Sequence, residues 1–95
     1  MLSFTVRMRF EESDHEAIQA ALVALTTGSR QEPGCVNYVC HFLADDPCTV
    51  LIYEQYQDEA ALEHHRNTQH FKDFAIGVLY QRMKERHVEN LTAVA

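Results

Sequence analysis

Two kinds of apolar spacing alternate along this chain, and their order constrains the fold more than any other feature. In some segments every second residue is apolar, as in 2–10, which is typical of a strand with two different faces. In others the apolar residues recur every third or fourth position, which is typical of a helix with one buried stripe. We expect strands at 2–10, 35–43, 49–57 and 85–94, and helices at 13–29, 58–65 and 68–84.

This order of elements predicts the fold class. A strand, a helix, two strands, an interrupted helix and a last strand make a split β-α-β-β-α-β arrangement, the ferredoxin-like pattern of an α+β domain. Its sheet is antiparallel and carries helices on one face only, so the other face needs a cover. A chain of 95 residues builds a thin core. We therefore expect one domain over 1–95 that forms a homodimer.

Local signals mark the ends of the expected elements. Ser13 followed by Glu16 is a capping-box pattern that opens the first helix. Gly28 and the 32–34 stretch close this helix, since glycine permits positive φ and proline restricts the residue before it. The 44–48 stretch, rich in turn-forming residues, predicts a hairpin between the second and third strands.

The second helical region is interrupted. Asp58 is placed to cap a short helix, and Thr68 is placed to cap the next one after a break at 67–68. The two helices thus lie end to end, with a corner between them.

Composition excludes several classes of partner. The net charge is −6 and the basic residues are scattered, whereas nucleic-acid binding uses a clustered basic face. No apolar run reaches the length of a membrane span, and the N-terminal segment lacks the pattern of a signal peptide, so we expect a cytoplasmic protein. The three cysteines match no zinc-ligand spacing and are interpreted as buried, reduced thiols.

Several stretches together resemble a known family. They are 32–35 (EPGC) with Tyr38, 53–56 (YEQY), 58–62 (DEAAL), His65, Thr68, His70 and Phe71. Their order and spacing over nearly the whole chain resemble the antibiotic biosynthesis monooxygenase family. The resemblance implies a dimer whose two sheets face each other as a barrel, with a pocket between sheet and helices in each subunit.

The family hosts more than one chemistry. Some members oxidise quinols or polycyclic phenols with molecular oxygen and without a metal, flavin or haem, others degrade haem, and one branch isomerises a small phosphorylated metabolite. This chain has no tryptophan, Tyr56 stands where tryptophan is frequent, and its first strand has no asparagine, which argues against haem degradation. We expect no cofactor.

Three residues are candidates for acid–base chemistry. His65 and His70 flank the helix break, and imidazole exchanges protons near neutral pH. Both also suit a structural role, as hydrogen-bonding groups that hold the corner. Glu54 lies on an apolar strand face, where a carboxyl is costly to bury unless it is paired or protonated. It is either a general base or a structural anchor for an arginine or a histidine.

Further residues are candidates for lining a substrate pocket. Asn37 and His41 share one face of the second strand, and Tyr53, Tyr56 and Phe71 complete the substrate-binding set. Water at a dimer seam would explain the polar residues equally well. No metal site is expected, because the histidines do not form an H-x-x-x-H pair, and no G-x-G-x-x-G motif indicates a nucleotide.

Three functions remain open at this point. The first is a cofactor-independent monooxygenase acting on a small phenolic or quinol-type aromatic compound. The second is an isomerase of a small enolisable metabolite, which an inward-facing Arg7, Arg9, Arg66 or Lys72 would favour if the substrate is phosphorylated. The third is a dimer that binds a small ligand without catalysis, which a pocket filled by its own aromatic side chains would favour.

Overall fold

A computed structural model describes all 95 residues of the chain. The strands are β1 (Leu2–Arg9), β2 (Cys35–Leu43), β3 (Asp46–Tyr56) and β4 (Glu85–Leu91), and the helical elements are η1 (Glu12–Asp14), α1 (His15–Ser29), α2 (Glu59–Arg66), η2 (Phe71–Leu79) and α3 (Tyr80–Arg82). The expected β-α-β-β-α-β order and α+β class are confirmed. None of the helices combines the length and the apolar character that a membrane-spanning helix requires.

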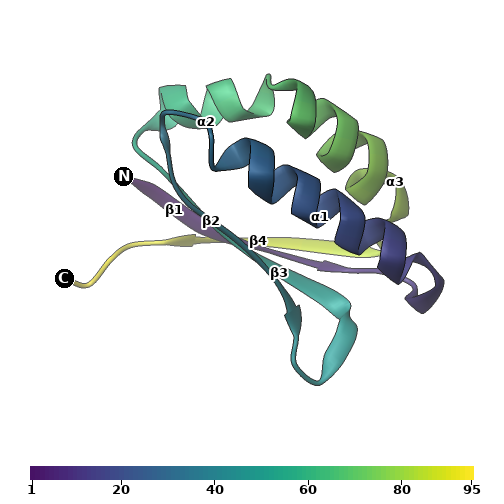
Figure 1. Cartoon of the computed structure of the whole chain (residues 1–95). Coiled ribbons are helices and arrows are strands. Elements are labelled where there is room, and N and C mark those ends of the chain that lie inside the picture. Colours follow the sequence, from purple (N-terminus) through teal and green to yellow (C-terminus); the bar gives the residue numbers. More distant parts are fainter.

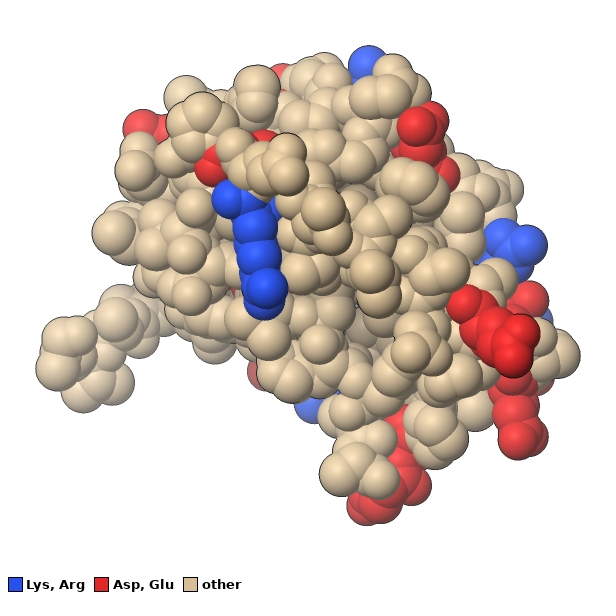
Figure 2. Space-filling view, in the orientation of Figure 1, with Lys and Arg blue, Asp and Glu red and all other residues tan.

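The four strands form one antiparallel sheet in the order β2-β3-β1-β4. All helices pack on the same face, and the other face of the sheet is bare (Figure 1). Both chain ends lie at the same end of the sheet (Figure 1). On the face shown in Figure 2, lysine and arginine side chains stand apart from one another and form no broad basic surface.

The core lies between the sheet and the helices. Val6 and Met8 of β1 pair with Ile52 and Val50 of β3, so the four side chains share the helix-facing side of the sheet. The apolar stripe of α1 covers them with side chains that are almost fully buried: Ile18, Ala21, Leu22 and Leu25. The alternating apolar residues of the strands and the apolar stripe of α1 therefore pack into one hydrophobic cluster, as the sequence predicts.

The expected boundary signals are only partly correct. The Ser13 hydroxyl caps no helix, because 12–14 form a turn of 3₁₀ helix and α1 begins at His15 without a side-chain cap. No glycine has positive φ. The glycines serve close packing instead: a Cβ on Gly28 would lie 2.6 Å from the His70 ring, and one on Gly34 would lie 2.3 Å from Cβ of Ala61. The expected hairpin turn is also shorter, since β3 already begins at Asp46.

The caps of the interrupted helix are confirmed. Asp58 accepts a hydrogen bond from the backbone N–H of Ala61 at 2.8 Å, and Thr68 accepts one from the N–H of Phe71 at 3.2 Å. The helix after the break is a π-helix, in which the N–H of Tyr80 bonds to the carbonyl of Ala75. Helical segments of this kind are rare and are frequent at functional sites.

Candidate active site

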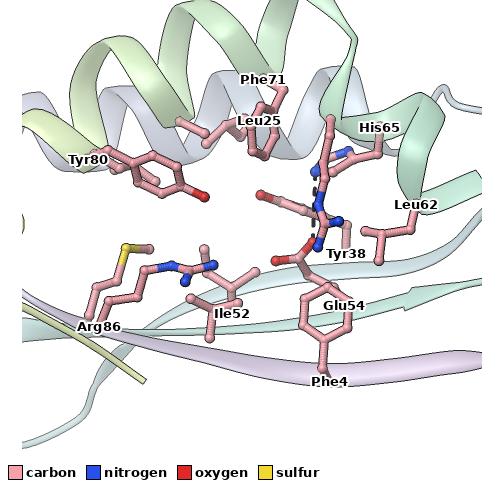
Figure 3. A pocket seen from close by; sticks show the side chains of 15 residues that line it. Phe4, Leu25, Tyr38, Ile52, Glu54, Leu62, His65, Phe71, Tyr80 and Arg86 are labelled. Atoms are coloured by element: carbon pink, nitrogen blue, oxygen red, sulfur yellow. Dashed lines mark ion pairs between the residues drawn. The ribbon is translucent and has the colours of Figure 1, made fainter. Parts of the chain in front are cut away.

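A cavity lies between the sheet and the helices, next to the corner between α2 and η2 (Figure 3). The volume of the cavity is about 50 Å³, measured as the space that the centre of a water molecule can occupy. Since one water needs about 10–15 Å³ of such space, the cavity takes a few waters or one small ring. Its walls are mainly apolar and aromatic, and its ionisable or hydroxyl-bearing side chains are Tyr38, Glu54, His65, Arg66, Tyr80 and Arg86.

A row of five polar side chains runs from the surface to the cavity. The Nδ1 atom of His65 lies 2.9 Å from Oε2 of Glu32, and Nε2 of His70 contacts the same oxygen. On its other side, Nε2 of His65 lies 3.8 Å from Oε1 of Glu54. The Tyr56 hydroxyl donates to that oxygen at 2.7 Å. Glu54 thus stands at the cavity, and His65 connects it to Glu32.

Local chemistry puts these groups in place. Glu32 follows the end of α1, and its backbone N–H bonds to the carbonyl of Ser29. His65 occupies the last turn of α2, where the Thr68 hydroxyl donates to its carbonyl at 2.7 Å. Because Gly28 has no side chain, the ring of His70 fits against α1 and reaches Glu32. The helix break and one glycine therefore bring the two histidines to one carboxylate.

Burial shifts the pKa of the carboxyl group of Glu54 and that of the imidazole of His65. Burial raises the pKa of Glu54 from 4.5 to about 7, although the Tyr56 hydrogen bond and the charges of Arg86 and Arg66 oppose the rise. Burial lowers the pKa of His65 below 6.5, against the hydrogen bond and the charge of Glu32. Burial thus favours the neutral form of both groups, the protonated carboxyl and the unprotonated imidazole, and such a pair is suited to general acid–base catalysis.

The tyrosines act as hydrogen-bond donors at this site. Burial, followed by the charge of Glu54, raises the pKa of Tyr56 and that of Tyr38 well above the ordinary value, so both hydroxyls stay protonated. In Figure 3 the hydroxyl groups of Tyr38 and Tyr80 point toward each other across the cavity. A substrate oxygen bound there would meet hydroxyl donors on one side and Glu54 on the other.

The structure brings five of the expected site residues together. Glu54, His65 and Phe71 line the cavity. Tyr56 is fully buried behind Glu54, and its ring centroid lies 5.1 Å from that of His65. His70 lies on the outer side of Glu32.

The remaining expected residues lie elsewhere. Asn37, His41 and Tyr53 all face the bare side of the sheet, away from the cavity. The Nδ2 group of Asn37 donates to the side chain of Gln55 at 2.8 Å, and Nδ1 of His41 lies 3.0 Å from the carbonyl of Leu51. These contacts stay within the sheet surface.

Glu32 is the site residue that sequence reasoning missed. The sequence indicates a helix end at Glu32 and no role in the site, yet Glu32 is 7% exposed and contacts both histidines. Its place in the stretch resembling the family was the one available signal. Nothing in its local spacing relates it to residues 33 and 38 positions further along the chain.

With Glu32, the two histidines form a group of side chains that could bind a metal ion. One ligand atom each from Glu32, His65 and His70 lies within 4.8 Å of the others. Two imidazole nitrogens and a carboxylate form a donor set that suits zinc or iron(II). The contacts that the three side chains make with one another already account for their burial, so no ion is needed to explain the cluster.

Comparison with known proteins places this geometry in context. A family model described as antibiotic biosynthesis monooxygenase matches residues 1–75. The curated protein "Putative monooxygenase Rv0793" of Mycobacterium tuberculosis is 36% identical over 58 residues, which span 61% of this chain and 56% of that protein. The aligned part is thus little more than half of the relative's length.

Solved structures match over nearly the full chain. Protein PA3566 from Pseudomonas aeruginosa has a TM-score of 0.89 and 32% identity, covering 99% of this chain and 94% of its own. A Bacteroides thetaiotaomicron protein described as a "Putative antibiotic biosynthesis monooxygenase" has a TM-score of 0.92 and 27% identity, covering 99% and 90%.

Proposed function

Because the chain belongs to the antibiotic biosynthesis monooxygenase family, we propose that it is a cofactor-independent monooxygenase of a small phenolic or quinol-type aromatic compound. One observation carries this proposal. Glu54 and His65 stand side by side at the wall of an aromatic cavity, each buried and each held by a second hydrogen-bonding partner. Such a pair can take the proton of a phenol that enters the cavity.

The role of Glu54 and His65 is to make the substrate reactive toward oxygen. The pair removes the phenolic proton, and the phenolate transfers one electron to O2, which gives superoxide and a phenoxyl radical. The two combine to a peroxide at a ring carbon, and the pair returns its proton to the outer oxygen. Loss of the proton on that carbon then breaks the O–O bond and forms a carbonyl, and the hydroxide that leaves takes up this proton as water.

The atoms and electrons of this reaction balance. The ring loses two hydrogen atoms and gains one oxygen atom, while the second oxygen atom leaves in water. The substrate supplies all four electrons that O2 accepts. What the protein contributes is deprotonation, positioning and the exclusion of bulk water from the cavity.

The proposal includes a homodimer that forms through the bare face of the sheet. Val39, Leu51 and Tyr53 lie on this face and are only half-buried in the single chain. Covering an apolar sheet face is a strong reason for association. We also infer a reducing, cytoplasmic setting, because Cys35, Cys40 and Cys48 are free thiols.

Oxygen uptake tests the proposed activity. Chelator-treated protein is offered a panel of single-ring phenols and quinols, and uptake is compared with autoxidation. We expect uptake that depends on the protein, is unchanged by the chelator and releases a quinone. His65→Asn should lower it by about a hundredfold or more, as for a lost acid–base group. His64→Asn, an exposed neighbour on α2, is the matched control and should keep full uptake. Equal loss in both variants would contradict the assignment.

One observation favours a second function, the isomerisation of a small enolisable metabolite with a phosphate group. Arg66 lines the cavity, as this function requires, and Arg86 joins it. Glu54 and His65 would then move a proton between neighbouring carbons without oxygen. Turnover of an enolisable phosphate under argon, with no oxygen uptake on the phenol panel, would select this function.

A further inference from the structure

Two arginines at the cavity have no acidic partner in the chain. Arg66 comes from the last turn of α2 and Arg86 from β4, and both line the cavity. The ion pairs of arginine and lysine are Arg9 with Glu85, Arg82 with Asp14 and Lys84 with Glu11. Arg7, Arg30 and Lys72 are also without an ion pair, but of the unpaired cations only Arg66 and Arg86 line the cavity. In a chain with a net charge of −6, acidic partners are not scarce.

The placement of Arg86 makes its lack of a partner informative. It pairs in register with Met8 of β1, whose side chain lies in the core, so Arg86 projects from the helix-facing side of the edge strand. Its guanidinium carbon lies 5.5 Å from the centroid of the Tyr80 ring. In Figure 3 the Arg86 side chain points across the cavity toward Glu54. A surface arginine turned inward in this way leaves its donors available to a bound molecule.

The charges of Arg66 and Arg86 both act on the carboxyl group of Glu54. Each lowers the pKa of Glu54, against the larger effect of burial, so both guanidinium groups lie near that carboxyl without pairing with it. Glu54 is the one acidic side chain of the cavity wall. When Glu54 is protonated, the wall keeps two positive charges and no negative one.

We propose that Arg66 and Arg86 form an anion-binding subsite of the cavity, and that the substrate is a single aromatic ring bearing a carboxylate or phosphate group. This deepens the proposed function and rests on it. Guanidinium groups bind both kinds of group through paired, charge-assisted hydrogen bonds. The anionic group sits between the arginines, and the ring extends toward Tyr38, Glu54 and His65. The phenolic oxygen then lies on the side of the acid–base pair.

Equilibrium binding tests the subsite without turnover. The protein is titrated under argon, with NMR as the readout, against para-hydroxybenzoate and phenyl phosphate and against the neutral para-hydroxybenzamide and phenol. We expect at least one of the anions to bind about tenfold or more tightly than its neutral counterpart, the size of one charge-assisted hydrogen bond. The anion that binds more tightly shows whether the charged group of the substrate is a carboxylate or a phosphate.

Variants assign the preference to the two arginines. In Arg66→Gln/Arg86→Gln the anion should lose about tenfold in affinity or more, while the neutral compounds keep theirs. Arg82→Gln removes a cation that pairs with Asp14 outside the cavity, and should change neither. Equal binding of anions and neutral compounds, or a preference that survives in the double variant, overturns the subsite. An intact preference without oxygen uptake would overturn only the proposed activity.

Discussion

The Nδ1 atom of His65 lies 2.9 Å from Oε2 of Glu32, although 33 residues separate the two in the chain. This contact decides how the imidazole is used. Because the carboxylate of Glu32 accepts a hydrogen bond, the proton of the neutral imidazole lies on Nδ1. The other nitrogen, Nε2, faces Glu54 and keeps its lone pair. The side chain of His65 is 3% exposed and that of Glu32 5% exposed, so no water competes for the contact.

Replacing Glu32 tests its role in orienting His65. In Glu32→Gln the charge that both imidazoles contact is lost, and we expect a loss of about 1–3 kcal/mol in the free energy of unfolding, as for a buried charged hydrogen-bond partner. Oxygen uptake should fall while binding of a neutral phenol is kept, because the ring of His65 loses the charged acceptor that orients it. Glu63→Gln, an exposed acid on the same helix as His65, is the control. A Glu32→Gln protein with full stability and uptake contradicts the assignment.

The pH dependence of stability reports on Glu54. Its pKa is about 7 in the folded chain and 4.5 in the unfolded chain, so the folded state holds the proton more tightly. This contribution to stability is complete below pH 4.5 and is lost as the pH rises through 7. At about 1.4 kcal/mol per pKa unit, the loss is about 3 kcal/mol.

Glu54→Gln removes this dependence. Urea unfolding at a series of pH values should show that the wild type loses stability relative to the variant between pH 4.5 and 7. His65 acts in the opposite sense, since its pKa is lowered and its contribution is lost as the pH falls, so it does not produce a loss of stability as the pH rises. Parallel stability curves for the two proteins would show that Glu54 titrates normally.

Gly34 tests the packing of α2 against the loop before β2. An alanine there would place its Cβ 2.3 Å from Cβ of Ala61, so the helix must shift away. We expect Gly34→Ala to lower the free energy of unfolding by about 1–3 kcal/mol, as in an overpacked core. Gly77→Ala is the control, because its Cβ would lie 3.3 Å from the carbonyl oxygen of Lys72, which has to move by only a few tenths of an ångström, and helix propensity favours alanine. Similar melting temperatures for both variants would remove the steric argument.

Leu51 tests whether the bare sheet face forms the dimer interface. It sits on that face between Arg7 and His41 in register. We expect light scattering to find a dimer for the wild type and a folded monomer for Leu51→Glu, because the interface would bury a carboxylate whose desolvation costs more than pairing with the facing Arg7 returns. Val23→Glu places the same charge on the exposed side of α1 and should leave the dimer intact. A dimer that persists in Leu51→Glu would place the interface elsewhere.

The predictable part of the fold depends on short-range patterns. The alternation of 2–10, the stripe of α1 and the caps Asp58 and Thr68 each involve residues less than one element apart, and their physical causes are local. The wrong assignments were those in which a local pattern competed with packing. The Ser13 capping box is not used because a 3₁₀ turn precedes α1.

The order of the elements, the apolar stripe of α1 and the candidate acid–base residues Glu54 and His65 follow from the sequence by itself, because period and side-chain chemistry are local properties. Only the tertiary structure decided that Glu32 contacts both His65 and His70, and that Arg66 and Arg86 line one cavity. These groups come from the loop after α1, from α2, from the turn before η2 and from β4. Their meeting depends on how the helices pack against the sheet that contains β4, and the spacing of residues along a chain carries no record of that packing.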